Sequence, residues 1–329
     1  MTVAMNHWSL GAAAGILLLG LNVDAQAQTF PDKPIKIIVP AAAGGPTDVP
    51  ARLASQILPP RLNQPIVIEN RPGAGGAIGA KAVATAAPDG YTLMAGNTSV
   101  FAVIPAVSAS AGYDPIKDFA PVAKVSESFQ ILVVRPSFPA NTLKEFIDYA
   151  KANPGKVTYS SPGIGTTPHL SGELFKRMAG IELIHVPYRG AGAGAITDTI
   201  AGRVDSAFNT TGSLLQTVRS GQLRGLAVTT LKRFPTAPEL PTIAESGIPG
   251  FDVSSWYALF VPAKTPPEII ARLNAATVTA LSEPAVRARF EPLGVVVESS
   301  TPEGLGALLQ SEIDKWGPII KAAGISASN

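Results

Sequence analysis

The chain has 329 residues, with 26 Lys and Arg against 24 Asp and Glu, and no cysteine. This near balance of charge excludes the basic footprint of a nucleic-acid-binding protein, and the lack of cysteine excludes disulfides, thiolate catalysis and zinc–cysteine sites. With 46% apolar residues, the chain can bury a core large enough for two domains.

The first 27 residues have the pattern of an export signal. Trp8 to Leu21 is an apolar run too short to span a bilayer as a stable helix. The segment Ala25–Ala27 after it is a small-x-small site of the kind that signal peptidase cuts. We therefore expect residues 1–27 to be a signal peptide and the remaining chain to be periplasmic. Because no Lys or Arg precedes the run, a buried or amphipathic N-terminal helix is the alternative.

Strand-like and helix-like runs alternate along the remaining chain. The predicted elements of the first third are strands at 35–39, 66–69 and 91–95 and helices at 47–58 and 81–87. Gly-Pro and Pro-Asp-Gly turns separate them. Repeated strand–turn–helix units of this kind indicate a mostly parallel sheet covered by helices.

Two Thr-x-x-Glu patterns, at Thr142 and Thr265, predict capped helix starts, the second with Pro266 at the first helical position. The last predicted helix carries apolar residues at helical spacing, which predicts a core-facing stripe. Its members are Leu305, Leu308, Leu309, Ile313, Trp316 and Ile320.

Two extended runs, at 131–134 and 256–261, interrupt the alternation and lie between blocks that have their own strand–helix units. They are candidates for chain crossings between two domains. This reading predicts one domain from residues 28–128 plus 253–329 and an inserted domain from residues 129–252.

No pattern in the sequence indicates catalysis, a metal or a cofactor. After the predicted signal the only histidines are His169 and His185, which are expected to be structural. No G-x-S-x-G nucleophile motif occurs. The run from Gly190 to Ala195 formally matches the G-x-G-x-x-A pattern of dinucleotide sites, but no acidic residue follows about 20 positions on.

Three segments share a strand, a Gly-containing turn and a helix start: Val39–Asp48, Tyr159–His169 and Val186–Gly192. Helix N-termini offer unpaired N–H groups and a partial positive charge, which favour anions. In open α/β sheets ligands bind at the carboxyl ends of strands, where such turns lie. Two domains facing each other with these turns would hold a carboxylate between them. The alternative is that the glycines only permit tight turns.

These three segments, together with further blocks of the sequence, resemble the Bug-type extracytoplasmic solute receptors of the tripartite tricarboxylate transporter family. The resemblance runs from Phe30 to Trp316. Its blocks are Phe30–Ile35, Glu69–Gly76, Pro88–Leu93, Tyr113–Val122, His185–Tyr188, Arg224–Val228 and Pro241–Glu245.

The resemblance implies an α/β fold of the type II-like periplasmic binding proteins, with two domains, each a mostly parallel sheet flanked by helices, and a ligand cleft between them. It implies a monomeric receptor, not an enzyme, that captures a di-, tri- or aromatic carboxylic acid without a cofactor. The partner would be a two-component integral membrane transporter. A secreted enzyme or a sensor-linked receptor using the same cleft are the alternatives.

The resemblance also implies the ligand-binding residues. They are Ala41, Ala43, Gly44, Gly45, Thr47 and Asp48 at the first turn, and Ser161, Gly165, Thr166, His169, Arg189, Gly190, Ala191 and Asn209 in the inserted domain. Arg189 stands where the family more often has Lys. The family's first turn usually reads Pro-Phe-Ala-Pro-Gly-Gly, whereas here Ala41 replaces the Phe and Ala43 the second Pro. The missing ring predicts room for a bulkier acid.

Overall fold

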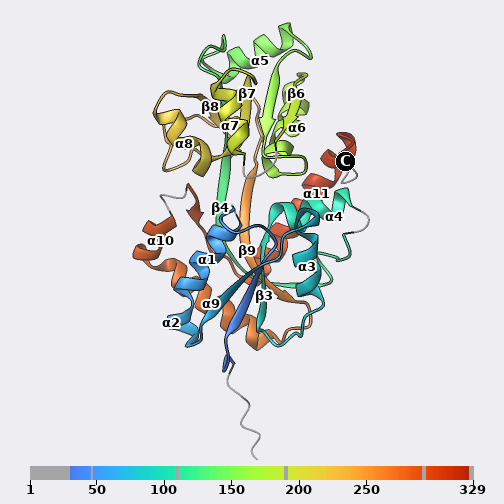
Figure 1. Cartoon of the computed structure of the whole chain (residues 1–329), viewed down its shortest axis with the longest axis vertical. Helices are drawn as coiled ribbons and strands as arrows, with labels where there is room; N and C mark the ends of the chain where they lie inside the picture. Colours follow the sequence, from blue (N-terminus) through green and yellow to red (C-terminus); the bar gives the residue numbers. More distant parts are fainter. Residues whose placement is uncertain (1–29, 46, 109–110, 189–191, 291–293, 326–329) are drawn as a thin grey trace, which may run out of the picture.

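The structure, a computed structural model, describes residues 30–45, 47–108, 111–188, 192–290 and 294–325. Figure 1 shows two lobes, one above the other, joined by two long strands. The predicted signal peptide lies outside the described residues. Within the described ranges, no helix combines the length and the apolar character needed to cross a membrane.

The lower lobe is built on a parallel sheet. Its central strand β1 (Ile35–Val39) is β-branched and buried, and pairs in parallel with β2 (Ile66–Asn70) and β3 (Thr92–Asn97). The other elements of this lobe are α1 (Asp48–Ile57), α2 (Pro59–Leu62), η1 (Ala74–Gly76), α3 (Ala77–Ala84), η2 (Ser99–Val103), α4 (Ile104–Val107), α9 (Pro267–Ser282), α10 (Pro284–Phe290), β10 (Val296–Val297) and α11 (Pro302–Ala322). The strands and helices predicted in the first third are therefore confirmed, with shifts of a few residues at their ends.

The upper lobe repeats this design on a smaller scale. Strand β5 (Thr158–Ser161) pairs in parallel with β6 (Ile184–Pro187) and β7 (Ser206–Thr210). The other elements are α5 (Leu143–Ala152), α6 (Thr167–Ala179), α7 (Ala193–Ile200), α8 (Thr211–Arg219) and β8 (Arg224–Val228).

Two strands connect the lobes. Strand β4 (Phe119–Val134) pairs antiparallel with β9 (Ser254–Pro262) up to Phe129, and with β7 and β8 from residue 130 onward. The described strands thus form one 10-stranded sheet that continues from lobe to lobe. The α/β class is confirmed, but the sheet is parallel only within β1–β3 and β5–β7, because the chain reverses direction at the crossings.

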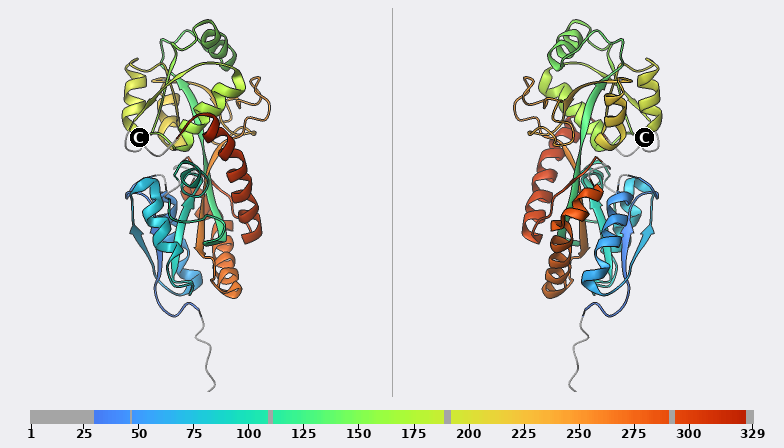
Figure 2. Two further views of the ribbon diagram at one scale, coloured as in Figure 1. Left: turned by 90° about the vertical axis from the view of Figure 1, so that its right-hand side faces the viewer. Right: turned by 90° about the vertical axis from the view of Figure 1, so that its left-hand side faces the viewer.

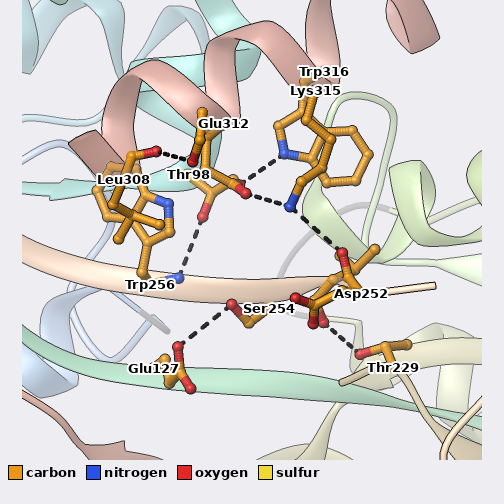
Figure 3. Close-up of polar contacts among 12 residues, drawn as sticks. Thr98, Glu127, Thr229, Asp252, Ser254, Trp256, Leu308, Glu312, Lys315 and Trp316 are labelled. Atoms are coloured by element: carbon orange, nitrogen blue, oxygen red, sulfur yellow. Dashed lines mark hydrogen bonds and ion pairs between the residues drawn. The ribbon is translucent and has the colours of Figure 1, made fainter. Parts of the chain in front are cut away.

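The extended runs at 131–134 and 256–261 lie within β4 and β9, the two strands that run between the lobes. The exact domain limits, 28–128 plus 253–329 and 129–252, stay a prediction. Figure 3 shows how the start of β9 is held. Lys315 Nζ contacts the carbonyl of Asp252, and Ser254 Oγ contacts Glu127 on β4.

Helix α11 links the cores of both lobes. Leu305 and Leu309, near its start, pack with Phe101 and Phe260 of the lower lobe. Trp316, farther along, belongs to the buried cluster that contains the core of the upper lobe. Figure 2 shows the helix running beside the crossing strands toward the upper lobe. The predicted apolar stripe is therefore confirmed, and its second half packs across the lobe boundary.

The two predicted helix caps have different outcomes. Thr142 Oγ1 accepts a hydrogen bond from Glu145 N at 3.2 Å, so the cap of α5 is confirmed. The cap at Thr265 is wrong: helix α9 begins one residue later than predicted, at Pro267, with Pro266 as its N-cap. The Thr265 hydroxyl instead donates to the carbonyl of Pro262, which stabilises the turn after β9.

We predict that Trp316→Ala lowers the free energy of unfolding by about 3–5 kcal/mol, as expected for a buried indole replaced by a methyl group. Trp316 is fully buried, and its Nε1 donates to the buried Glu312 carboxylate at 2.9 Å. Urea unfolding followed by far-UV circular dichroism measures the loss. The control is Lys321→Ala, at an exposed position of the same helix. Equal effects of the two variants would contradict the role of Trp316 between the lobes.

Candidate functional site

A cavity of about 140 Å³ lies between the lobes, and both lobes and β9 contribute to its walls. Its lining residues are Thr47, Asn97, Thr98 and Ser99 from the lower lobe, Pro162, Thr166, Thr167, Pro168, Asn209 and Thr210 from the upper lobe, and Ser255 and Tyr257 from β9. Among these described residues there is no Lys, Arg, Asp or Glu. The cavity therefore offers hydroxyl and amide groups without a formal charge.

The cavity lies where strands end and helices begin. Thr47, Thr166 and Thr210 are the N-cap residues of α1, α6 and α8. The Thr166 side chain caps its own helix by accepting from His169 N. The partial positive charges of α6 and α8, two helices of the upper lobe, favour a negative group in the cavity.

Asn209 presents an amide donor at this site. Its side chain is 1% exposed, and its Oδ1 accepts a hydrogen bond from Thr210 N at 2.8 Å. Its Nδ2 has no hydrogen-bond partner among the described residues. The start of α7 comes so close that a Cβ on Gly192 would lie 2.3 Å from this nitrogen. A buried N–H without a partner costs free energy, so a ligand acceptor would satisfy it.

Three hydroxyls of the cavity are oriented by protein donors. Thr47 Oγ1 accepts from Asn97 Nδ2 at 2.6 Å, and Thr98 Oγ1 accepts from Trp256 N at 3.2 Å. The second of these contacts is drawn in Figure 3. Ser255 Oγ accepts from Gln130 Nε2 at 3.1 Å. Each hydroxyl keeps its own proton for another acceptor.

Gln130 is fully buried at the crossing of the lobes and is hydrogen-bonded at both ends of its amide. Besides the bond from Nε2 to Ser255, its Oε1 accepts from Ser171 Oγ and from Thr229 Oγ1, each at 3.1 Å. Ser255 belongs to β9, Ser171 to α6, and Thr229 is the residue directly after β8. The network holds the cavity wall at Ser255 against the upper lobe.

Asp48 organises the first turn. Its buried carboxylate accepts from Gly44 N at 2.8 Å, from Arg52 Nε at 2.6 Å and from Asn70 Nδ2 at 2.8 Å. Burial alone would raise the pKa of Asp48, but the hydrogen bonds from Arg52, Gly44 and Asn70 outweigh it and lower the pKa below its ordinary value. The charged carboxylate thus fixes the conformation of the turn at 41–45.

The first-turn residues predicted for the site divide into two groups. Thr47 lines the cavity, whereas Ala41, Ala43, Gly44, Gly45 and Asp48 are not among its lining residues and form the turn beside it. Gly44 has φ +77°, a conformation that glycine adopts without strain. The amides of Gly44 and Gly45 donate within the turn, to Asp48 Oδ2 and to the Ala42 carbonyl. Ala41 is partly buried against the lower core.

Only some of the site residues predicted in the upper lobe line the cavity. Thr166 and Asn209 line the cavity. Ser161 at the end of β5, Gly165 in the turn before α6 and His169 in the first turn of α6 do not line it. The predicted residues Arg189, Gly190 and Ala191 lie outside the described residues.

The two histidines are brought together, although α6 separates them in the sequence. Their rings stack with centroids 4.1 Å apart. His169 Nδ1 accepts from Gly165 N at 3.1 Å, and His185 Nε2 lies 2.7 Å from Ser161 Oγ. Within the described ranges, no three His, Asp or Glu side chains converge as a metal site requires. Burial lowers the pKa of His169 to about 4 and that of His185 to about 3.

Nine lining residues were not among the predicted site residues: Asn97, Thr98, Ser99, Pro162, Thr167, Pro168, Thr210, Ser255 and Tyr257. The first three follow the apolar run of β3, and Ser255 opens the apolar run of β9. Their position, as polar residues at the ends of apolar strand segments, is the sequence feature that could have identified them.

We predict that the free energy of unfolding falls as the pH is lowered from about 7 to 5. Both imidazoles titrate near 6.5 in the unfolded chain but stay neutral in the folded protein, so the unfolded state binds more protons in this range. The slope is at most about 1.4 kcal/mol per pH unit for each imidazole, because each contributes at most one proton to the difference between the two states. Urea unfolding across this range measures the slope, and His185→Gln should reduce it. A stability independent of pH would contradict the prediction.

The comparisons with known proteins agree with this architecture. Residues 51–325 match the receptor family of the tripartite tricarboxylate transporters. The chain is 36% identical to the protein BugT of Bordetella pertussis over 323 residues, which cover 97% of this chain and 99% of BugT.

Two similar solved structures contain carboxylates. A protein of R. palustris with adipate superposes with a TM-score of 0.80 at 35% identity, covering 90% of this chain and 99% of that protein. MatC from Rhodopseudomonas palustris with bound malate superposes with a TM-score of 0.76 at 36% identity, covering 88% of this chain and all of MatC, 100%. By sequence and fold, this chain belongs to the receptor family of the tripartite tricarboxylate transporters.

Proposed function

We propose that this protein is a periplasmic receptor that captures a small organic carboxylate and delivers it to a two-component membrane transporter. The observation that carries the proposal is the cavity between the lobes, lined by neutral donors that include Asn209 Nδ2, which has no hydrogen-bond partner among the described residues. The adipate and malate found in two members of similar structure support a carboxylate as the ligand.

The site is suited to bind a carboxylate without a cationic side chain among its described residues. Each hydrogen bond from a neutral donor to a carboxylate oxygen contributes about 1.5–3 kcal/mol. The donors are fixed by their own partners, so little conformational entropy is lost when they bind. The N-termini of α6 and α8 add a favourable field. Because Ala41 is not among the residues that line the cavity, the bulkier acid expected from the missing Phe ring stays a prediction.

We further propose that residues 28–128 plus 253–329 and residues 129–252 are domains that close on the ligand. Both lobes contribute donors, so only a closed state makes all contacts. Motion would be centred on β4 and β9 near Gln130 and Ser255, where the lobes share one sheet.

A secreted enzyme or a sensor-linked receptor remains the alternative. Ser161 and His185 form a serine–histidine hydrogen bond, which by itself would suit a hydrolase. However, Ser161 is fully buried and neither residue lines the cavity. This placement favours a binding protein that returns its ligand unchanged.

Periplasmic location depends on the predicted signal at 1–27. The intact mass of protein isolated from the periplasm should correspond to a chain that begins at or near Gln28. Retention of residues 1–27 on that material would contradict export by this signal.

Mass spectrometry of the small molecules released from denatured, freshly purified protein tests the proposed function. We expect an organic acid, released chemically unchanged. Added back at 100 times its Kd, this acid should raise the free energy of unfolding by about 2.7 kcal/mol. If only sugars, cations or amides stabilise the protein, the carboxylate proposal is wrong.

We predict that Asn209→Ala weakens carboxylate binding at least about tenfold, since a hydrogen bond to a charged group is lost. Isothermal titration calorimetry measures the change. The matched control is Asn141→Ala, an exposed position ahead of α5. An unchanged affinity of the Asn209 variant would show that the ligand does not use this donor.

A further inference from the structure

Helix α11 carries the two residue types that favour a helix least, Gly317 and Pro318, side by side in its second half. Pro318 has no backbone N–H, so the carbonyl of Asp314, one turn earlier, receives no helical hydrogen bond from it. Gly317 adds a residue whose backbone loses much conformational entropy when it becomes helical. The hydrogen-bond ladder of α11 is therefore weakened between residues 314 and 318.

Packing does not require either residue. Pro318 is exposed, and a Cβ added to Gly317 would meet no atom within 4 Å. Gly317 also has no positive φ, the backbone conformation for which glycine is often needed. Alanine at both positions would fit and would strengthen the helix. The weakness is therefore a property of the backbone of α11 that its surroundings do not impose.

The weak point lies where α11 passes from one lobe to the other. Before it, Leu305 and Leu309 pack in the core cluster of the lower lobe. After it, Ile319 and Ile320 belong to the cluster that contains the core of the upper lobe. Figure 2 shows the end of the helix beside the upper lobe. The two halves of α11 are thus attached to different lobes.

Helix α6 connects the end of α11 with the ligand cavity. At its start, Thr166, Thr167 and Pro168 line the cavity between the lobes. Near its end, Lys176 borders a crevice of about 260 Å³, and Ile319 borders the same crevice from α11. A movement of α6 with the upper lobe would therefore reach α11 beyond Pro318.

From these observations we infer that α11 bends at Gly317–Pro318 when the lobes close. Residues 302–313 stay with the lower lobe, and residues 319–325 move with α6 and the upper lobe. Kinks at Pro and Gly are a common way for a helix to accommodate such a change of direction. The inference rests on the lobe closure proposed above and adds a third bending connection to β4 and β9.

Distances between pairs of nitroxide labels, measured by pulsed electron paramagnetic resonance, test the inference. The chain has no cysteine, so labels can be placed on cysteines introduced at exposed positions. These are Ala275→Cys in α9 of the lower lobe, Lys151→Cys in α5 of the upper lobe and Lys321→Cys at the end of α11. The probes are adipate and malate, the acids found in two proteins of similar structure.

With the acid that binds, we expect the distance from residue 275 to residue 151 to shorten. The distance from 275 to 321 should change as well, whereas the distance from 151 to 321 should stay constant, because the end of α11 follows the upper lobe.

The double variant Gly317→Ala with Pro318→Ala tests the cause, because it restores the helical ladder without a steric conflict. We expect it to reduce the acid-induced change in the 275–151 distance by at least about half, because a stiffer helix opposes the movement. The matched control is Gly306→Ala in the first half of α11, where the added Cβ would lie 3.7 Å from Pro121 Cγ, an ordinary contact. Pro318→Ala alone covers the case in which the double variant fails to fold.

The outcomes separate the bend in α11 from the proposed closure. If the lobes close while the 275–321 distance stays constant, or if the stiffened variants close as fully as the parent, the inference is overturned and the receptor remains. If no distance changes with either acid, the proposed closure fails and the inference fails with it.

Discussion

The buried amide of Gln130 is the interaction on which the rest of the site depends. It lies on β4 where the sheet passes from one lobe to the other, and it is fully buried. A buried amide without partners would destabilise the fold, but here Ser255, Ser171 and Thr229 satisfy it. The same bonds orient the Ser255 hydroxyl toward the cavity. The hydrogen bonds that stabilise the crossing of the lobes therefore also orient a hydroxyl of the candidate binding site.

The crossing differs in character from the two cores that it connects. The cores are aromatic and aliphatic, whereas the adjoining parts of β4 and β9 carry Ser126, Ser128, Gln130, Ser254 and Ser255. Helix α11 spans this crossing, because Trp316 packs with the upper lobe while Leu305 packs with the lower.

Many strands and helices could be predicted because they depend on residues that are close together in the sequence. The strand β1 and the cap at Thr142 follow from β-branched residues and a Thr-x-x-Glu pattern. The antiparallel reversal at β4 and β9 was not predictable from periodicity, because pairing between residues more than a hundred positions apart leaves no local signal.

For the site, the predicted strand–turn–helix units adjoin the cavity, and Thr47, Thr166 and Asn209 line it. The stacking of His169 on His185 and the donors from β9 depend on tertiary packing. A turn sequence also cannot show which amides face a ligand: those of Gly44 and Gly45 donate within the turn itself.

A crystal structure of the protein with its released acid is the most direct test of the account. We expect the ligand to lie between the lobes, with an oxygen at hydrogen-bond distance, about 2.7–3.2 Å, from Asn209 Nδ2 and with further oxygens facing the hydroxyls of Thr98 and Ser255. A ligand bound outside this cavity, or one that presents a nitrogen donor to Asn209, would contradict it.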